Sequence, residues 1–201
     1  NPLLASDTNL IALDARIVLF DKNETPPKLA IRPYPNDYIL DLKLKNGEEV
    51  TLRPIRPEDE PLVVAFHKEL SENSVRQRYF EFVSLSDRIA HERLIRIIFN
   101  DYDREMALVA IYKGEVVGIG RLSQLPGLNE VQFTMLIRDD FHNKGLGTAM
   151  LKHLITIAKL ENRSKIHATI LSENNVMIDM VKRLGFTATP EDNLVQAELI
   201  L

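Results

Sequence analysis

The sequence predicts an α/β (α+β) fold, with a mixed, mostly antiparallel sheet of about six to seven strands, flanking helices and a short N-terminal β extension. Three observations lead to this expectation. An apolar, β-branched stretch ending at Ile137 is followed by a glycine-bearing loop and then by an amphipathic helical pattern that continues to Leu160. The turn signals Asn46-Gly47 and Lys113-Gly114 join neighbouring strand patterns into hairpins. Helical patterns occupy the region between these hairpins.

The composition limits the classes of function. The 201 residues are 45% hydrophobic, which is enough for one well-cored domain and an appendage. A net charge of −4 does not suggest a nucleic-acid partner. The sequence has no cysteine, which excludes disulfides, thiolate metal sites and a cysteine nucleophile, and we expect no metal. It shows no signal peptide and no apolar run of membrane-spanning length, so we expect a cytoplasmic protein without a membrane partner.

The N-terminal segment has a strand pattern of its own. Ile11 to Phe20 is expected to form a strand after a polar turn, and Pro26-Pro27 marks a charged linker. We therefore divide the chain into a segment, residues 1–36, and a domain, residues 37–201. Because the sequence begins at Asn1 without a methionine, we expect it to be part of a longer, multidomain chain.

The first part of the domain reads as a hairpin, a helical region and a second hairpin. Pro57 suits a first helical turn, and the acidic residues after it complement the helix dipole. Gly118 and Gly120 lie within a strand pattern, which indicates a bulge or a close backbone approach. The expected elements are strands at 38–44 and 49–55, helices from Pro57 to about Leu70, from Asn73 to Phe82 and from Ser84 or Ser86 to about Phe99, and strands at 106–112 and 115–122.

The central feature is the connection between the strand that begins near Glu130 and the helix that follows. Gly145 and Gly147 leave room where the first N–H groups of a helix are unpaired, and these donors favour an anion such as phosphate or pyrophosphate. The loop matches neither a nucleotide-kinase phosphate loop nor a dinucleotide fingerprint. A tight turn without a ligand is the other interpretation of the two glycines.

The C-terminal region is expected to contain a further strand, a further helix and a final strand. Ile166 to Leu171 is expected to be a strand, and Asn174 begins a helix that runs to Leu184. Gly185 suits the left-handed end of that helix, and Val195 to Leu201 supplies a final strand.

This order of elements, with an anion loop between a strand and a helix, resembles the GNAT superfamily of acyl-CoA-dependent N-acetyltransferases. The family's loop signature is Gln/Arg-x-x-Gly-x-Gly/Ala, and here the first position is His142. The resemblance implies acetyl-CoA as cosubstrate, with its pyrophosphate held by the loop residues His142, Asn143, Lys144, Gly145, Leu146, Gly147 and Thr148. It also implies that the backbone of Met135, Leu136 and Ile137, together with Asn174, contacts the pantetheine arm, although Asn174 is equally well explained as a helix cap.

Two further stretches narrow the resemblance. Residues 51–61 and 101–110 are similar to the acetyltransferase module of Pat-type protein lysine acetyltransferases. Residues 1–5 and 12–17 look like the closing hairpin of an ATP-grasp domain in NDP-forming acyl-CoA synthetases, where an Asn before Pro can bind magnesium. Asn1 stands at that position, but with the rest of such a domain missing we assign it no function. In Pat-type proteins the acetyltransferase module follows an acyl-CoA synthetase-like region that ends in an ATP-grasp fold. The N-terminal segment and the domain therefore both imply a protein of this kind.

The catalytic base is where the sequence departs from the family. In GNAT enzymes a Glu on the strand before the loop often takes the proton, and alignment places Gln132 there. Glu130 lies on the same face of the strand, displaced by about 7 Å. We hypothesise that Glu130 is a surrogate base acting through a water; a solvated Glu at a strand start is the alternative. Asp101, Asp103 and Glu105 are interpreted either as attracting a cationic lysine or as structural.

The resemblance implies an enzyme that transfers acetyl from acetyl-CoA directly to an amine, namely a lysine on a protein such as an acyl-CoA synthetase. A neutral amine is required, and only about one lysine in a few thousand is neutral at pH 7. Two alternatives stay open: a non-catalytic acyl-CoA-sensing regulatory domain, which Gln132 favours, and an acetyltransferase for a small amine.

Overall fold

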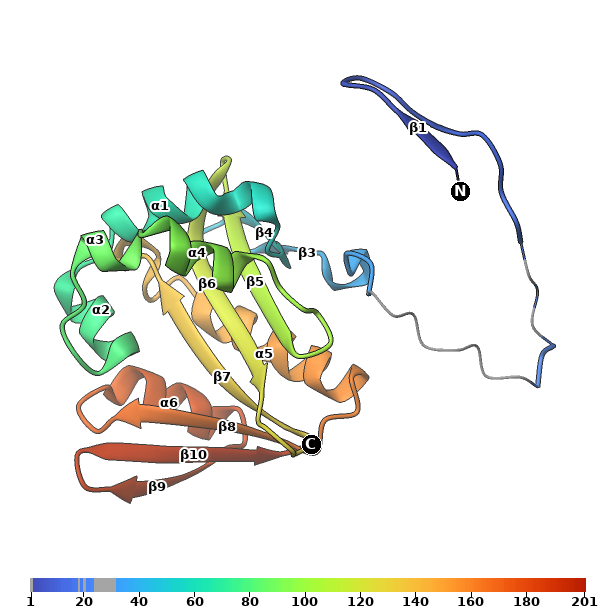
Figure 1. Cartoon of the computed structure of the whole chain (residues 1–201). Coiled ribbons are helices and arrows are strands. Elements are labelled where there is room, and N and C mark those ends of the chain that lie inside the picture. Colours follow the sequence, from blue (N-terminus) through green and yellow to red (C-terminus); the bar gives the residue numbers. More distant parts are fainter. Residues whose placement is uncertain (1, 18, 20, 24–31) are drawn as a thin grey trace. The chain divides into compact units, whose positions relative to one another are not determined.

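The computed structural model describes residues 2–17, 19, 21–23 and 32–201, which belong to two compact units, Asn1–Ile31 and Arg32–Leu201 (Figure 1). In the first unit, β1 (Leu3–Ala5) pairs antiparallel with β2 (Leu10–Ala12). The predicted strand from Ile11 to Phe20 is wrong in extent, because residues 13–17 are not in a strand; Val18 and Phe20 lie outside the described residues. Asn1 and the Pro26-Pro27 linker lie outside the described residues.

The second unit is built on one eight-stranded sheet with the order β3-β4-β5-β6-β7-β8-β10-β9. Neighbouring strands are antiparallel except for β7 and β8, which are parallel, so the predicted mixed, mostly antiparallel sheet is confirmed. The strands are β3 (Leu40–Lys43), β4 (Glu49–Pro54), β5 (Glu105–Tyr112), β6 (Glu115–Gln124), β7 (Glu130–Ile137), β8 (Lys165–Leu171), β9 (Thr187–Glu191) and β10 (Leu194–Ile200).

Strand β9 is the element that the sequence did not predict. It is a mostly exposed strand that contains Pro190, lies at the edge of the sheet and pairs with β10. An edge strand of this kind tolerates proline and needs no alternation of apolar residues, so it leaves little signal in the sequence.

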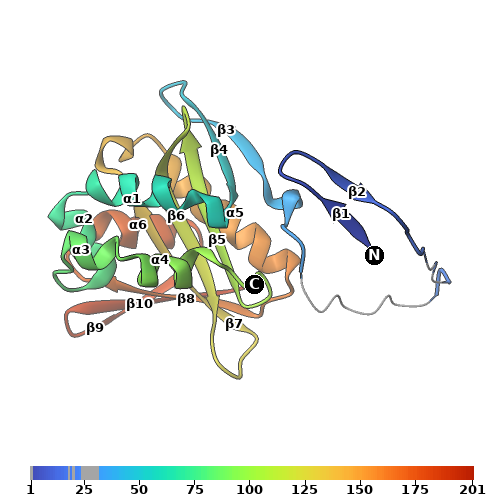
Figure 2. The ribbon, with the colours of Figure 1, turned by 45° about the horizontal axis from the view of Figure 1, so that its top comes forward.

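Helices cover both faces of the sheet (Figure 2). The helices α1 (Glu60–Lys68), α2 (Glu72–Tyr79), α3 (Leu85–Arg88) and α4 (His91–Ile98) lie on one face, α5 (Leu146–Leu160) lies on the other, and α6 (Asn175–Arg183) lies beside the C-terminal strands.

The predicted single helix from Ser84 to Phe99 is wrong, because α3 and α4 are separate helices. Ala90, between them, has non-helical backbone, with φ −56° and ψ 126°. Before it, Ser84 caps α3 by accepting a hydrogen bond from Asp87 N at 3.1 Å. The buried guanidinium of Arg88 donates to the main-chain oxygens of His67 (3.0 Å) and Val83 (3.2 Å), which holds this turn against the end of α1.

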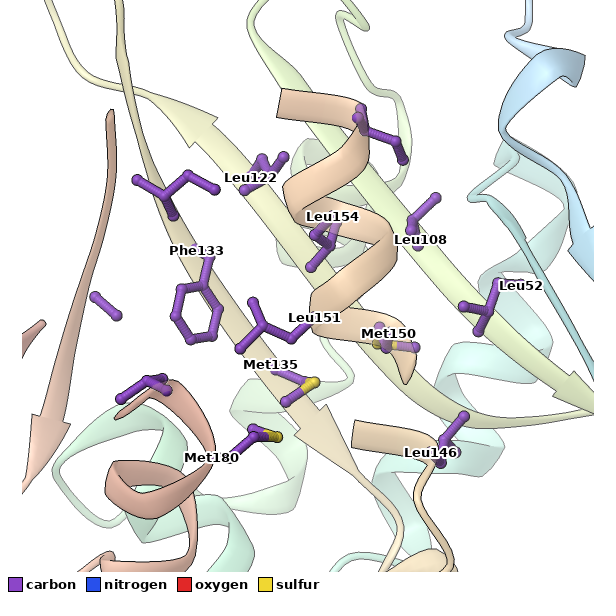
Figure 3. Close-up of a cluster of buried hydrophobic side chains, with 14 of the residues drawn as sticks. Leu52, Leu108, Leu122, Phe133, Met135, Leu146, Met150, Leu151, Leu154 and Met180 are labelled. Atoms are coloured by element: carbon purple, nitrogen blue, oxygen red, sulfur yellow. The ribbon is translucent and has the colours of Figure 1, made fainter. Parts of the chain in front are cut away.

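A hydrophobic core fills each face of the sheet. One core joins the sheet to α5 and α6 and includes Leu108, Met150 and Leu154 (Figure 3). The other joins the opposite face to α1 and α4 and includes Val63, Phe66, Leu94 and Ile98. The predicted close approach at Gly120 is confirmed, because a Cβ there would meet Met150 Sδ at 2.6 Å. Within the described part of the chain, no helix has the length and apolar character that a membrane crossing requires. The cytoplasmic location stays a prediction.

Candidate functional site

The site begins where β7 and β8 separate. Their parallel ladder joins Glu130, Val131 and Gln132 to β8 and then stops, while β7 stays paired with β6 and β8 with β10 (Figure 1). A cleft of about 860 Å³ opens at this point, and both the end of β7 and the Ala168–Ile170 stretch of β8 line it. Backbone groups of β7 beyond Gln132 that face β8 therefore have no partner in that strand and are available to a ligand.

The glycine loop brings the start of α5 to this cleft. Gly145 has φ +92°, a left-handed conformation that glycine adopts readily, and it caps α5. The first hydrogen bond that turns into the helix runs from Ala149 N to Gly145 O at 3.0 Å. The N–H groups of Leu146, Gly147 and Thr148 therefore have no acceptor within the helix. The predicted strand, glycine turn and helix are present, with donors that suit an anion.

Side chains of the loop point in different directions. His142 and Asn143 line the cleft, with His142 Nε2 3.0 Å from Ile137 O. Lys144 Nζ instead pairs with Glu48 at 3.0 Å and lies 4.3 Å from the centre of the Phe141 ring. Leu146 is fully buried, so Leu146 offers its backbone alone.

Lys45 is a cleft residue that the sequence did not indicate. It lies in the turn between β3 and β4, where its N–H donates to Lys144 O at 3.1 Å, and its side chain reaches the region of Gly145. Its distance along the chain from the loop explains why no local pattern revealed it.

The predicted pantetheine contacts border the cleft. Met135, Leu136 and Ile137 line it from β7, and Asn174 lines it from the start of α6. Asn174 is buried and accepts a hydrogen bond from Met177 N at 3.1 Å, so its predicted role as a helix cap is confirmed.

A polar row crosses three strands at the inner end of the cleft. Gln132 lies opposite Ser123, and Ser123 lies opposite Glu105. Ser123 Oγ donates to Glu105 Oε1 at 3.1 Å, and all three residues line the cleft. Carboxylate, hydroxyl and amide groups thus share one face of the sheet.

Glu130 is placed differently from this row. It lies on the same face of β7 as Gln132, but its Oε2 is 2.5 Å from His167 Nε2, and Glu130 is not among the residues that line the cleft. The acidic run is also divided: Glu105 lines the cleft and pairs with Arg121 at 2.8 Å, Asp101 pairs with Arg104, and neither Asp101 nor Asp103 borders the cleft.

Asp139 fixes the helix that closes one side of the cleft. It accepts hydrogen bonds from Ser71 N (3.0 Å), Ser71 Oγ (2.6 Å) and Ser74 Oγ (2.8 Å), all at the start of α2. Burial alone would raise the pKa of Asp139, but these hydrogen bonds outweigh burial and lower the pKa below its ordinary value. A charged Asp139 therefore holds α2 against the end of β7.

The side of the cleft formed by α2, α4 and β6 carries residues that the sequence did not single out. Arg78 and Tyr79 come from α2, Arg93 from α4 and Arg121 from β6. Only Arg121, a charged residue within an apolar strand, gave a hint of this placement.

A cleft between separating parallel strands, ending at the unpaired N–H groups of a helix, defines a protein that binds an elongated, phosphate-bearing cosubstrate. The sequence model of the family described as "Acetyltransferase (GNAT) domain" matches residues 49–187, more than half of the chain. The chain therefore belongs to the GNAT acetyltransferase family, whose members use acetyl-CoA.

Individual relatives agree with this assignment. The chain is 28% identical over 156 residues to acetyltransferase PA5475 of Pseudomonas aeruginosa, covering 75% of this chain and 82% of that protein. The GNAT domain of S. lividans PAT matches with a TM-score of 0.77 and 25% identity, covering 84% of this chain and 100% of that chain. PaiA N-acetyltransferase from Thermoplasma acidophilum, solved in complex with coenzyme A, has the same fold, with a TM-score of 0.63, 15% identity, and 76% and 99% of the two chains covered.

Proposed function

We propose that this N-acetyltransferase moves the acetyl group of acetyl-CoA directly to the amine of a protein lysine. The observation that carries the proposal is the cleft, which joins the N-terminus of α5 at one end to the polar row of Glu105, Ser123 and Gln132 at the other. The lysine acceptor rests on the resemblance of residues 51–61 and 101–110 to Pat-type modules. In the transfer, the neutral amine forms a C–N bond to the acetyl carbon as the C–S bond breaks, one proton of the amine passes to a base, and coenzyme A leaves as its thiolate.

The coenzyme's place in the cleft follows from the charges and the free backbone groups. We assign its pyrophosphate to the N–H groups of Leu146, Gly147 and Thr148, with Lys45 and His142 beside them. The pantetheine would run along Met135 to Ile137, where the backbone facing β8 has no strand partner. With this assignment, the thioester would lie near Gln132, and the side formed by α2, α4, β5 and β6 would be free for the acceptor.

Calorimetric titration of acetyl-CoA and coenzyme A tests the cofactor site. Gly145→Glu places a carboxylate in the proposed anion site and should reduce the affinity at least tenfold. Gly145→Asn is the matched control, because Asn tolerates the left-handed backbone better than other residues and adds no charge. No binding by the unmodified chain, or equal binding by both variants, would contradict the proposed cofactor site.

Acceptor class is tested separately by mass spectrometry of a lysine-containing protein after incubation with acetyl-CoA. Acetyl-lysine that depends on the chain supports the proposal. Acetyl-CoA binding with no transfer to any amine supports the alternative of a regulatory acyl-CoA sensor. Transfer to free amines and not to proteins supports the small-amine alternative.

A further inference from the structure

The acceptor side of the cleft is cationic. Three guanidinium groups line it, those of Arg78, Arg93 and Arg121, against one carboxylate, that of Glu105. We call these three arginines the arginine cluster. Arg121 Nη1 pairs with Glu105 at 2.8 Å, and Arg121 also donates to the main-chain oxygen of Ile97, so Arg121 is balanced within the protein.

Arg78 and Arg93 are not balanced in this way. Arg78 donates to Thr134 Oγ1 at 3.1 Å, and the guanidinium carbons of Arg78 and Arg93 each lie 5.0 Å from the centre of the Tyr79 ring. Within residues 2–17, 19, 21–23 and 32–201, neither guanidinium has a carboxylate partner. Burial is the main cause that lowers the pKa of Arg78, and the charges of Arg121 and Arg93 lower it further.

Arg78 and Arg93 are half-buried, and cations that are partly removed from water are normally paired, because an unpaired charge away from water is costly. Two neighbouring guanidinium groups that share an aromatic ring and face an open cleft therefore indicate an anion that arrives with the ligand. Arginine is suited to this task, because its planar fork binds a carboxylate through two parallel hydrogen bonds.

Resting on the proposed function, we propose that the acceptor amine carries a carboxylate close to it, and that Arg78 and Arg93 bind this carboxylate. The same two cations disfavour a protonated amine nearby, which helps supply the neutral amine that attacks the thioester. The carboxylate has two sources: an Asp or Glu beside the lysine of a protein, or the α-carboxylate of a free amino acid.

Matched acceptors test the proposal. The first pair is the end-blocked peptides Ala-Glu-Lys-Glu-Ala and Ala-Gln-Lys-Gln-Ala, and the second is L-leucine and L-leucinamide. Each is assayed for acetyl transfer by the wild-type chain, Arg78→Gln, Arg93→Gln and the control Arg76→Gln. Arg76 is on the same helix, outside the cleft lining, and pairs with Glu173 at 3.0 Å. For each pair we divide kcat/KM of the acceptor that carries the carboxylate by kcat/KM of its amide counterpart. Comparing this ratio between the wild type and a variant cancels the intrinsic reactivity of each amine.

We expect Arg78→Gln and Arg93→Gln each to reduce this ratio about tenfold or more, mainly through KM, for at least one pair, as for a lost charge-assisted hydrogen bond. The Arg76→Gln ratio should stay at the wild-type value. An effect in the peptide pair identifies an acidic neighbour of lysine, and an effect in the leucine pair identifies an α-carboxylate.

Ratios that stay unchanged in Arg78→Gln and Arg93→Gln would overturn the proposal, and a lower melting temperature in those variants would then assign the two arginines a structural role around Tyr79. Acetyl-CoA affinity, measured by calorimetry, shows whether each variant keeps its coenzyme site. If wild-type chain that binds acetyl-CoA acetylates a protein lysine but none of the four acceptors, this inference is overturned; if it acetylates no protein lysine either, the proposed transfer activity is removed as well.

Discussion

At the scale of single residues, burial sets the charge of His67. Its side chain is 3% exposed, and its Nδ1 meets no hydrogen-bonding group among the residues that the structure describes. Burial, with smaller contributions from Arg88, Arg93 and Arg78, lowers the pKa of His67 from 6.5 to about 4. His67 is therefore neutral at pH 7 and adds no charge to the cleft wall.

This neutral histidine predicts a pH dependence of stability. Because the folded pKa of His67 lies below the unfolded value, its contribution is complete above pH 6.5 and is lost as the pH falls toward 4. His67→Gln should remove about 3 kcal/mol of the decrease in unfolding free energy between pH 7 and pH 4. Urea titrations at several pH values measure this change. His67→Phe, which also never ionises, should reduce the pH dependence of the unfolding free energy equally. A pH dependence that equals that of the wild type in both variants would contradict the prediction.

Two carboxylates compete for the role of catalytic base. Glu130 lies beside Gln132 along β7 and contacts His167, while Glu105 lies in the polar row and is paired with Arg121. Because both carboxylate oxygens of Glu105 already have partners, Arg121 on one and Ser123 on the other, we predict that Glu130 takes the proton through a water. Glu130→Gln should lower kcat about 10²-fold and remove the acid limb of the pH–rate profile, whereas Glu105→Gln should keep that limb. The reverse pattern would assign the base to Glu105.

At the scale of secondary structure elements, Asp139 determines how α2 is attached. Its hydrogen bonds to Ser71 and Ser74 join the end of β7 to the start of α2, the helix that carries Arg78 and Tyr79. Asp139→Ala should destabilise the chain by about 1–3 kcal/mol, because the hydroxyl of the buried Ser74 and two donors of Ser71 lose their acceptor. Its folded pKa is lowered, so the stabilisation exists above the unfolded pKa and is lost as the pH falls.

Hydrogen exchange of the α2 amides measures this attachment directly. We expect faster exchange in α2 of Asp139→Ala and unchanged exchange in α5. The control Asp140→Ala removes a neighbouring carboxylate that is 57% exposed and pairs with Arg138 at 2.7 Å. Equal exchange in α2 for both variants would show that the helix is held by its apolar contacts instead.

Packing of α5 on β6 depends on the absence of a side chain at Gly120. A Cβ there would lie 2.6 Å from Met150 Sδ and 3.0 Å from Leu154 Cδ1, which are closer than ordinary contacts. Gly120→Ala should therefore cost about 1–3 kcal/mol by overpacking. Combining it with Met150→Ala should cost less than the sum of the two single changes, because the shorter side chain makes room. Additive losses in denaturant titrations would rule out this clash as the cause.

Elements defined by local patterns were predictable from the sequence, and those defined by distant contacts were not. The β7 strand, the turn at Gly145 and the cap at Asn174 each follow from a few consecutive residues. Strand β9 and the break at Ala90 depend on neighbours that packing supplies, namely β10 and the end of α1. The loop half of the site was therefore visible in the sequence, whereas the arginine cluster was not, because three separate elements bring it together.

At the scale of the molecule, the cleft depends on one departure from antiparallel pairing. Antiparallel pairing along all eight strands would leave a continuous sheet, but the parallel pair β7 and β8 separates after Gln132, and the cleft opens between these two strands. The two hydrophobic cores lie on opposite faces of the sheet, and one of them contains residues of both β7 and β8. The cosubstrate loop and the arginine cluster are therefore supported by different cores, α5 with one and α4 with the other.

Both cores and every residue lining the cleft lie within Arg32–Leu201, which predicts that this unit folds and binds acetyl-CoA by itself. Arg32 belongs to it, since its guanidinium donates to Tyr102 O at 3.0 Å and pairs with Glu161 at 2.5 Å. A chain starting at Arg32 should keep its melting temperature within about 3 °C and its acetyl-CoA affinity within about twofold, because each core is complete. Starting at Tyr34 removes Arg32, and we expect a loss of about 1–2 kcal/mol and a melting temperature about 2–8 °C lower. Equal losses in both truncations would show that residues before Arg32 stabilise the domain.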